Sequence, residues 1–342
     1  MASPLLEIRD LKVSFRTEDG LVRAVDGVSL TLNEGETLGI VGESGSGKSV
    51  TMMSVMRLVT DPNAQFEGQV LYKGTDLMAL SQDQIRSIRG AGIGMIFQDP
   101  MTSLNPVYKV GWQIEEQIRE HETLSRPAAR ARAVDLLTAV GIPNARERID
   151  AYPHQFSGGM RQRVMIAMAV SCNPDVLIAD EPTTALDVTI QAQILSLIKK
   201  LREDFGTAVV LITHDMGVVA DMADRIAVMY AGRIVEQGTR RELFYDPQHP
   251  YTWGLLGSIA RLDRPRPRRL AAIPGMPPSL IRLPAGCAFS DRCAHRFARC
   301  SERPELLSHQ GTGHLDACHL SVEHKQEVRD RTIHPELVEE KP

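Results

Sequence analysis

The sequence lacks any long apolar run, and this absence limits how the chain can meet a membrane. No segment approaches the roughly 20 consecutive apolar residues that a helix needs to cross a bilayer. Residues 1–7 also lack the basic stretch followed by an apolar stretch that marks a secretory signal. We therefore expect a cytoplasmic protein, and any role at a membrane must come through partner subunits.

The sequence also lacks an excess of charge of one sign. It has 39 Lys and Arg residues against 43 Asp and Glu residues, which gives a net charge of −4 over 342 residues. A broad nucleic-acid-binding surface would need a basic excess, so no nucleic-acid partner is expected. The hydrophobic share of 43% and the charged share of 24% are those of an ordinary globular protein. The length suits two domains, or one large domain with an appendage.

The most informative segment is residues 42–49, Gly-Glu-Ser-Gly-Ser-Gly-Lys-Ser, which fits the phosphate-loop pattern at every fixed position. Residues 37–41 before it read as a buried strand and residues 50–58 after it read as a helix, which disfavours a chance match in a Gly/Ser-rich turn. The glycines let backbone N–H groups turn toward phosphate oxygens, and the helix N-terminus adds partial positive charge. Lys48 is expected to reach the β- and γ-phosphates, and the Ser49 hydroxyl to bind Mg²⁺. The residues expected to contact the nucleotide are Gly42, Ser44, Gly45, Ser46, Gly47, Lys48, Ser49 and Val50.

Apolar periodicity outlines the rest of the chain. Residues 6–15 and 25–32 alternate in the manner of antiparallel strands that lead into the phosphate loop. Apolar residues recur at helical spacing between 102 and 152, which predicts a mainly helical insertion. Three short apolar runs read as buried strands, at residues 93–97, 176–179 and 209–212. Strands that alternate with helices favour a mostly parallel, doubly wound sheet.

Polar residues follow these three buried strands. Gln98 follows the first, Asp180 and Glu181 follow the second, and His214 follows the third. Carboxylates at the carboxyl end of a buried parallel strand suit Mg²⁺ and an attacking water in a phosphate-loop enzyme. Residues 156–160, Phe-Ser-Gly-Gly-Met, open a further helix whose N-terminus suits an anion.

One aromatic residue, Phe15, precedes the phosphate loop. Its ring would stack on a nucleotide base or would pack in the core, and the sequence favours neither interpretation.

In this combination of motifs, the chain resembles the ATP-binding subunit of an ABC transporter of the dipeptide/oligopeptide permease type, over residues 4–320. By that resemblance, residues 42–49 are the Walker A loop and residues 156–160 are the signature motif. The common signature is Leu-Ser-Gly-Gly-Gln, so Phe156 and Met160 depart from it. The signature residues assigned to nucleotide contact are Ser157, Gly158 and Gly159.

The resemblance also implies a role for each polar residue. Gln98 is the Q-loop glutamine, Asp180 ends the Walker B motif, and Glu181 is the carboxylate that polarises the attacking water. His214 is the switch histidine that contacts the γ-phosphate, and residues 185–187 form the D-loop. The implied ligands of Mg²⁺ are Ser49, Gln98 and Asp180. The implied catalytic residues are Glu181, His214, Lys48 and Gln98.

The implied fold is an α/β phosphate-loop ABC ATPase domain, with a RecA-like, mostly parallel sheet, an antiparallel β subdomain and a helical insertion. We expect the nucleotide-binding domain in residues 1–240, with its helical subdomain at about 100–160. Residues 241–322 would form a small cysteine-containing C-terminal extension, which the sequence His-Pro-Tyr-Thr at 249–252 marks as that of a peptide permease. Composition predicts a disordered tail in residues 323–342.

The implied function is ATP-driven import of di- or oligopeptides, by a peripheral subunit on the cytoplasmic face of the inner membrane. The implied partners are two membrane-spanning permease subunits, a second and non-identical ATPase subunit, and an extracytoplasmic solute-binding protein. A nickel or other small-solute importer would use a similar subunit, so the solute stays open.

Two alternatives come from other classes, a non-transport ABC ATPase and a regulatory module that never hydrolyses ATP. Chromosome-type relatives carry long coiled coils, whereas the roughly one hundred residues between Ser49 and Ser157 show no sustained heptads. The presence of Glu181 and His214 disfavours a module without hydrolysis.

Four of the five cysteines lie in one short segment near the C-terminus, at Cys287, Cys293, Cys300 and Cys318. A cytoplasmic location disfavours disulfides, and four thiolates in a small segment suit zinc or an iron–sulfur cluster. The cysteines are separated by five, six and seventeen residues, without the close pairs typical of tetrathiolate zinc sites.

Similar cysteine sets in relatives of the peptide-permease type imply a [4Fe-4S] cluster. We therefore rank this cluster first, zinc second and unligated reduced thiols third. Three histidines are the alternative ligands, His295, His314 and His319. The fifth cysteine, Cys172, is expected to be a packing residue.

Overall fold

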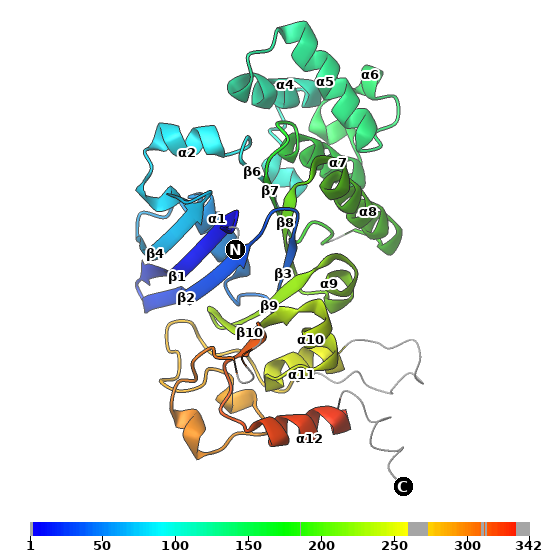
Figure 1. Ribbon diagram of the computed structural model, residues 1–342. Helices are drawn as coiled ribbons and strands as arrows, with labels where there is room; N and C mark the ends of the chain where they lie inside the picture. The colour runs from blue at the N-terminus through cyan, green and yellow to red at the C-terminus, as the bar shows by residue number, and fades with distance from the viewer. Residues whose placement is uncertain (1–2, 185, 259–272, 309–310, 312, 333–342) are drawn as a thin grey trace. The chain divides into compact units, whose positions relative to one another are not determined.

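The computed structural model describes residues 3–184, 186–258, 273–308, 311 and 313–332 (Figure 1). The chain divides into two compact units. The helical unit contains residues up to 5, 32–37 and 76–212, and the phosphate-loop unit contains residues 6–31, 38–75 and those from 213 onward.

An antiparallel sheet opens the phosphate-loop unit. It contains β1 (Leu6–Thr17), β2 (Gly20–Leu32), β4 (Ala64–Tyr72) and β5 (Thr75–Asp76), in the order β2-β1-β4-β5. Strand β1 pairs with β4 from Leu6 opposite Tyr72 to Phe15 opposite Ala64. Side chains alternate between the buried and the open face because the strand period is two. The predicted antiparallel strands ahead of the phosphate loop are therefore present.

The second group of strands in this unit carries the phosphate loop. Strand β3 (Thr37–Val41) is parallel to β9 (Arg225–Tyr230), and β9 pairs antiparallel with β10 (Arg233–Thr239). Every residue of β3 is buried, as its apolar run predicts. The short strand β11 (Leu315–Asp316) adds to the far side of β10.

Helix α1 follows the phosphate loop and runs over Lys48–Val55. It ends before the predicted residue 58, because Arg57 adopts a left-handed conformation with φ of 50°, which an α-helix cannot continue through.

The helical unit is built on three parallel strands, β6 (Ile93–Ile96), β7 (Val176–Asp180) and β8 (Ala208–Thr213). Ile93 lies opposite Val176, and Val176 lies opposite Ala208. All residues of these strands are buried, so they match the three apolar runs of the sequence.

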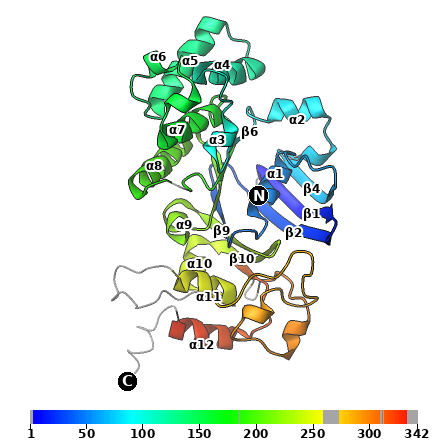
Figure 2. The ribbon, with the colours of Figure 1, turned by 180° about the vertical axis from the view of Figure 1, so that it is seen from behind.

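Helices supply the rest of this unit. They are η1 (Leu77–Ala79), α2 (Gln82–Ile88), α3 (Pro100–Ser103), α4 (Val110–His121), α5 (Arg126–Ala139), α6 (Ala145–Arg148), η2 (Pro153–Gln155), α7 (Gly158–Ala169) and α8 (Val188–Phe205). Figures 1 and 2 show α4, α5 and α6 gathered together, and this group is the predicted helical insertion. Within the described part of the chain, no helix combines the length and the apolar content needed to cross a bilayer.

The remaining helices belong to the phosphate-loop unit. They are α9 (Met216–Met222), α10 (Arg240–Tyr245), α11 (Pro250–Gly257), η3 (Ser290–Arg292), η4 (Ala298–Ser301) and α12 (Val322–Thr332). We refer to residues 241–332 as the C-terminal segment. The basic, proline-rich residues 261–269 lie outside the described residues.

Helix α12 corrects the prediction of a disordered tail from residue 323, as far as residue 332. The Lys325 ammonium is buried and donates to the Asp316 carboxylate at 2.6 Å. A buried ion pair holds a polar helix in place although the helix has little apolar surface. Residues 333–342 lie outside the described part of the chain.

A second buried pair ties the C-terminal segment to β10. The Glu236 carboxylate accepts hydrogen bonds from the backbone N–H groups of Gln248 and His249, at 2.6 and 3.0 Å, and it lies 2.8 Å from His314 Nε2. Burial by itself would lower the pKa of His314, but the hydrogen bond and the negative charge of Glu236 outweigh burial and raise it. The imidazolium form is therefore the one that the fold stabilises.

We predict that this pair makes the stability of the protein depend on pH. A raised folded-state pKa contributes stability that is complete below the unfolded value of about 6.5 and is lost as the pH rises through the folded value. His314→Gln should cost about 3 kcal/mol at pH 6 and should reduce the fall in stability between pH 6 and pH 9. Urea unfolding of the full chain at both pH values measures this. His154→Gln, at an exposed histidine, is the control, and an equal pH dependence in wild type and His314→Gln would contradict the prediction.

Candidate functional site

The phosphate loop, residues 42–49, connects β3 to α1 as predicted. Gly42 and Gly47 have positive φ angles of 157° and 101°. A Cβ atom on Gly42 would lie 2.1 Å from the Met229 carbonyl oxygen, and one on Gly47 would lie 2.3 Å from the Ala24 carbonyl oxygen. Both contacts are impossible, so the loop can adopt this conformation only with glycine at these positions.

Lys48 begins α1 and is buried, with 4% of its surface exposed. Its ammonium donates to the carbonyl oxygens of Gly42 and Glu43, at 2.8 and 2.9 Å. The cation is thus held over the loop, and the first N–H groups of α1 add the positive end of the helix dipole. This arrangement suits an anion such as a nucleotide phosphate.

Two acidic residues of the helical unit, Asp180 and Glu181, form an acidic group where β7 ends. Asp180 is the last residue of β7, and the Glu181 carboxylate accepts hydrogen bonds from Gln98 Nε2 at 3.0 Å and from Thr184 Oγ1 at 2.8 Å. Gln98 follows β6, which is parallel to β7, so both strands deliver polar groups to one edge of the sheet. Gln98 and Glu181, each of which follows a buried strand, are therefore in direct contact. Thr184 gave no signal in the sequence, because a single threonine after a strand is unremarkable.

Glu181 also has a strained backbone, with φ of 44°. Left-handed conformations are uncommon for residues other than glycine and cluster at functional sites. The Glu181 N–H donates to the Ile212 carbonyl oxygen at 2.9 Å, which holds the strained residue against the neighbouring strand.

The predicted site residues are divided between the two units. Gln98, Asp180 and Glu181 belong to the helical unit, whereas Lys48 and Ser49 belong to the phosphate-loop unit. His214, which is exposed directly after β8, is assigned with the phosphate-loop unit. In the predicted D-loop, Ala185 lies outside the described residues, and the Asp187 carboxylate caps α8 by accepting from the Ile190 N–H at 3.0 Å.

The predicted signature motif forms the start of α7. The Ser157 hydroxyl caps the helix by accepting from the Met160 N–H at 3.4 Å, and Gly158 has open space where a side chain would be. Phe156 is buried, so it fills an apolar position in place of the common leucine. Gln162 on the same helix donates to the Pro182 carbonyl oxygen at 2.7 Å and so links the signature helix to the residue after Glu181.

Phe15 lies on β1 opposite Ala64 and is only half-buried. It is therefore not a fully buried core residue.

The four clustered cysteines line one small cavity, together with His249, His295 and His319. Burial raises the pKa of Cys293 to about 11 and that of Cys318 to about 12, so both thiols are neutral at pH 7 in the absence of a cation. Within the described residues, no three His, Cys, Asp or Glu side chains are placed to hold one metal ion. Thiols and imidazoles are the donors that metal–thiolate sites use, but in this arrangement the described side chains do not form such a site.

Two residues that do not line the cysteine cavity have other partners. His314, one of the alternative ligands, pairs with Glu236 and does not line the cysteine cavity, which corrects its inclusion. Cys172 lies in the helical unit, where its Sγ contacts the Gln117 carbonyl oxygen and the Ser171 hydroxyl, each at 3.7 Å. A packing role for Cys172 agrees with these contacts.

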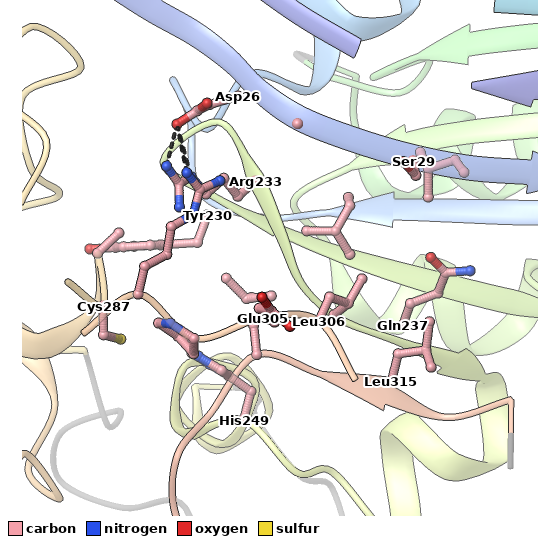
Figure 3. Close-up of a pocket in the computed structure, with 18 of the residues that line it drawn as sticks. Asp26, Ser29, Tyr230, Arg233, Gln237, His249, Cys287, Glu305, Leu306 and Leu315 are labelled. Carbon is pink, nitrogen blue, oxygen red and sulfur yellow. Dashed lines mark hydrogen bonds and ion pairs between the residues drawn. The ribbon is translucent and has the colours of Figure 1, made fainter. Parts of the chain in front are cut away.

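A wider cavity of about 810 Å³ lies within the phosphate-loop unit, between β1, β2, β10 and the C-terminal segment (Figure 3). Asp26 accepts hydrogen bonds from the Arg233 guanidinium there, and Arg303 lies 3.9 Å from the same carboxylate. The residues that line this cavity do not include 42–49, so it is separate from the phosphate loop. It marks where the N-terminal strands meet the C-terminal segment.

Two family models match the chain. The ABC transporter family matches residues 25–184, and the C-terminal region of oligopeptide/dipeptide transporters matches residues 235–300. Among characterised relatives, the oligopeptide transport ATP-binding protein OppD of Bacillus subtilis is 58% identical over 292 residues, which cover 85% of this chain and 82% of the relative. The dipeptide transport ATP-binding protein DppD of the same organism is 56% identical, over 86% of this chain and 88% of the relative.

Solved structures agree with these matches. The dimeric ATP-binding cassette MJ0796, in a post-hydrolysis state bound to ADP and Pi, is 30% identical with a TM-score of 0.62, over 69% of this chain and 99% of the cassette. CbiO1 of Clostridium perfringens, part of the ABC transporter complex cbiONQ, is 27% identical with a TM-score of 0.60, over 72% of this chain and 92% of that structure. The chain has a phosphate loop between β3 and α1, and it has Asp180 and Glu181 at the end of β7. Together with these matches, the two features show that the chain is an ABC-type ATPase. It belongs to the family of ABC transporter ATP-binding proteins that carry the oligopeptide/dipeptide transporter C-terminal region.

Proposed function

We propose that this protein binds and hydrolyses ATP to power the import of di- and oligopeptides through partner membrane subunits. The observation that carries the proposal is Glu181, a carboxylate in a strained conformation that Gln98 and Thr184 hold at the end of β7. A module that only bound nucleotide would have no need for such a group. The relatives named for oligopeptide and dipeptide transport support the peptide substrate.

In this proposal the phosphate loop binds the nucleotide. Lys48 would exchange its carbonyl acceptors for the β- and γ-phosphates, and the loop N–H groups would surround them. The Phe15 ring would stack on the base. The Ser49 hydroxyl, the Gln98 amide oxygen and the Asp180 carboxylate are the hard oxygen donors that Mg²⁺ prefers. Mg²⁺ held there would neutralise charge on the β- and γ-phosphates.

Hydrolysis in this proposal depends on positioning. Glu181 would orient the attacking water and accept its proton, and His214 would contact the γ-phosphate. The hydrogen bonds from Gln98 and Thr184 occupy one oxygen of the Glu181 carboxylate, Oε2. They thereby fix the orientation of the side chain and would keep Oε1 directed at water.

A second ATPase subunit would complete each nucleotide site in this proposal. Ser157, Gly158 and Gly159 at the start of α7 would approach the γ-phosphate bound to the partner's phosphate loop, because a helix N-terminus attracts anions. ATP binding would close the pair, and hydrolysis would reopen it. The helical insertion and Gln98 would transmit this motion to two permease subunits, from the cytoplasmic face of the inner membrane. An extracytoplasmic binding protein would deliver the peptide to these subunits from the opposite face.

We predict that Glu181→Gln abolishes most turnover while ATP binding persists. The variant keeps the hydrogen bonds from Gln98 and Thr184 but loses the proton acceptor, so the rate of ATP hydrolysis should fall at least about 100-fold. Equilibrium ATP titration and steady-state hydrolysis by the assembled transporter measure the two effects. Glu203→Gln, at an exposed carboxylate of α8, is the matched control. Lys48→Ala should instead weaken ATP binding, and hydrolysis near the wild-type rate in Glu181→Gln would contradict the role of Glu181.

We predict that the purified transporter contains two different ATPase chains. The departures at Phe156 and Met160 from the common signature are compatible with two unequal nucleotide sites. Native mass spectrometry of the complex should give one copy of this chain and one of a related chain. A complex with two copies of this chain and no other ATPase would favour a homodimer, the symmetric arrangement that most oligomers adopt.

We propose further that the four clustered cysteines hold a [4Fe-4S] cluster with a structural role, with zinc as the alternative. Their thiols converge on one cavity, and burial raises the pKa of three of them, Cys287, Cys293 and Cys318. A bound cation would stabilise the thiolates that burial disfavours. Small shifts of these side chains would have to bring the sulfur atoms within ligand distance.

This metal proposal predicts iron in protein that is purified without oxygen. The full chain should carry about four iron and four sulfide per molecule. Cys293→Ser should lose most of the iron, whereas Cys172→Ser should keep it. Elemental analysis and the visible absorption spectrum are the measurements. Colourless wild-type protein with one zinc per chain would establish the zinc alternative instead.

A further inference from the structure

Two side chains of the C-terminal segment converge on one residue of the phosphate loop, Glu43. The Tyr251 hydroxyl accepts a hydrogen bond from the Glu43 N–H at 2.8 Å. The Arg292 guanidinium donates to both carboxylate oxygens of Glu43, at 2.6 and 2.9 Å. Tyr251 comes from α11 and Arg292 from η3, so two separate parts of the segment hold the same residue.

Hydrogen bonds from all of its N–H groups fix the Arg292 guanidinium. Its side chain is 5% exposed, and each of its five N–H groups has an acceptor within hydrogen-bond distance. The acceptors are the two carboxylate oxygens of Glu43, the Tyr230 hydroxyl, and the carbonyl oxygens of Ile273 and Pro274. A cation saturated in this way has one orientation, and its bidentate contact gives Glu43 one orientation as well.

Packed aromatic rings support the Arg292 guanidinium. The ring centroids of Tyr230 and Tyr251 lie 4.6 Å apart, and those of Tyr230 and Phe289 lie 5.3 Å apart in an edge-to-face arrangement. Arg292 lies over the rings of Tyr230 and Phe289, at 5.8 and 6.0 Å. All three aromatic residues are at least 96% buried, so the guanidinium rests on a packed surface.

Glu43 connects this support to the group that binds phosphate. The carbonyl oxygen of Glu43 accepts from Lys48 Nζ at 2.9 Å and from the Ser46 N–H at 3.2 Å. The phosphate-loop pattern leaves position 43 free for any residue, so the motif itself does not require a carboxylate there. The Glu43 carboxylate, which pairs with Arg292, and the Glu43 N–H, which donates to Tyr251, are therefore features of this chain that contact the C-terminal segment.

We propose that Arg292 is a positioning residue for ATP binding. By holding Glu43 in one orientation, it keeps the phosphate loop and Lys48 in the conformation that accepts the phosphates. The affinity for ATP thus depends on the C-terminal segment. This inference rests on the proposed function of the loop as an ATP site and adds to it a control point outside the nucleotide motifs.

The test measures ATP affinity in the full chain for Arg292→Gln, Arg292→Lys and Glu43→Gln. Arg292→Gln and Glu43→Gln should each raise the Kd for ATP about tenfold, because each removes the bidentate contact. Arg292→Lys should have an intermediate effect, because an ammonium keeps the charge but not the paired geometry. In the assembled transporter, KM for ATP should rise while kcat stays within about twofold of wild type.

Two controls separate positioning from general damage. Arg296→Gln removes an arginine of the same segment whose pair with Asp291 is exposed, and it should leave the Kd unchanged. Iron and zinc content should be equal in wild type and Arg292→Gln, which excludes an effect through the neighbouring Cys293. The double variant Arg292→Gln/Glu43→Gln should be no weaker than either single variant, since the two residues act through one contact.

Three results would overturn the inference: an unchanged Kd in both Arg292→Gln and Glu43→Gln, a lower unfolding midpoint without a change in Kd, or additive effects in the double variant. Glu43→Gln is expected to fold, because this side chain lies at the surface of the loop with 28% of its area exposed. ATP binding by the wild-type protein is measured first. Wild-type protein that binds no ATP would contradict the proposed function itself and not the role of Arg292.

Discussion

The close approach of backbone to backbone at the phosphate loop is the constraint on which the other features depend. The Met229 and Ala24 carbonyl oxygens leave no room for a Cβ at Gly42 and Gly47, so β9, which carries Met229, and β2, which carries Ala24, define the path of the loop. The loop in turn presents Glu43 to the C-terminal segment and Lys48 to the space where an anion would lie. A shift of either strand would therefore disturb anion binding without altering any residue of the motif.

The acidic group obtains its geometry from a different source, the parallel strands β6, β7 and β8. Glu181 is placed by its left-handed backbone and by hydrogen bonds from Gln98 and Thr184. Strain of this kind persists only when the surrounding structure holds it, and the buried strands on both sides of β7 provide that support.

Ion pairs with buried partners hold the C-terminal segment in place, two of them to the rest of its unit and one within the segment. Glu236 with His314, Asp316 with Lys325, and Glu43 with Arg292 are ion pairs with at least one buried partner. Such pairs contribute little net stability compared with apolar packing, but breaking one leaves a buried charge without compensation. They therefore favour one position of the C-terminal segment, in addition to its apolar packing. The cysteine cavity lies in this segment, where a bound metal would add a further link.

The sequence by itself determined the features that local backbone rules encode. The phosphate loop, the buried strands and the helical insertion follow from glycine positions and apolar runs. Neither Arg292 with Glu43, 249 residues apart, nor Lys325 with Asp316 could be recognised in this way. A charged residue in a sequence reads as solvent-exposed, and no local pattern names its partner. Only the tertiary structure decided these pairs and the helix α12, because burial of a charge depends on which distant element packs against it.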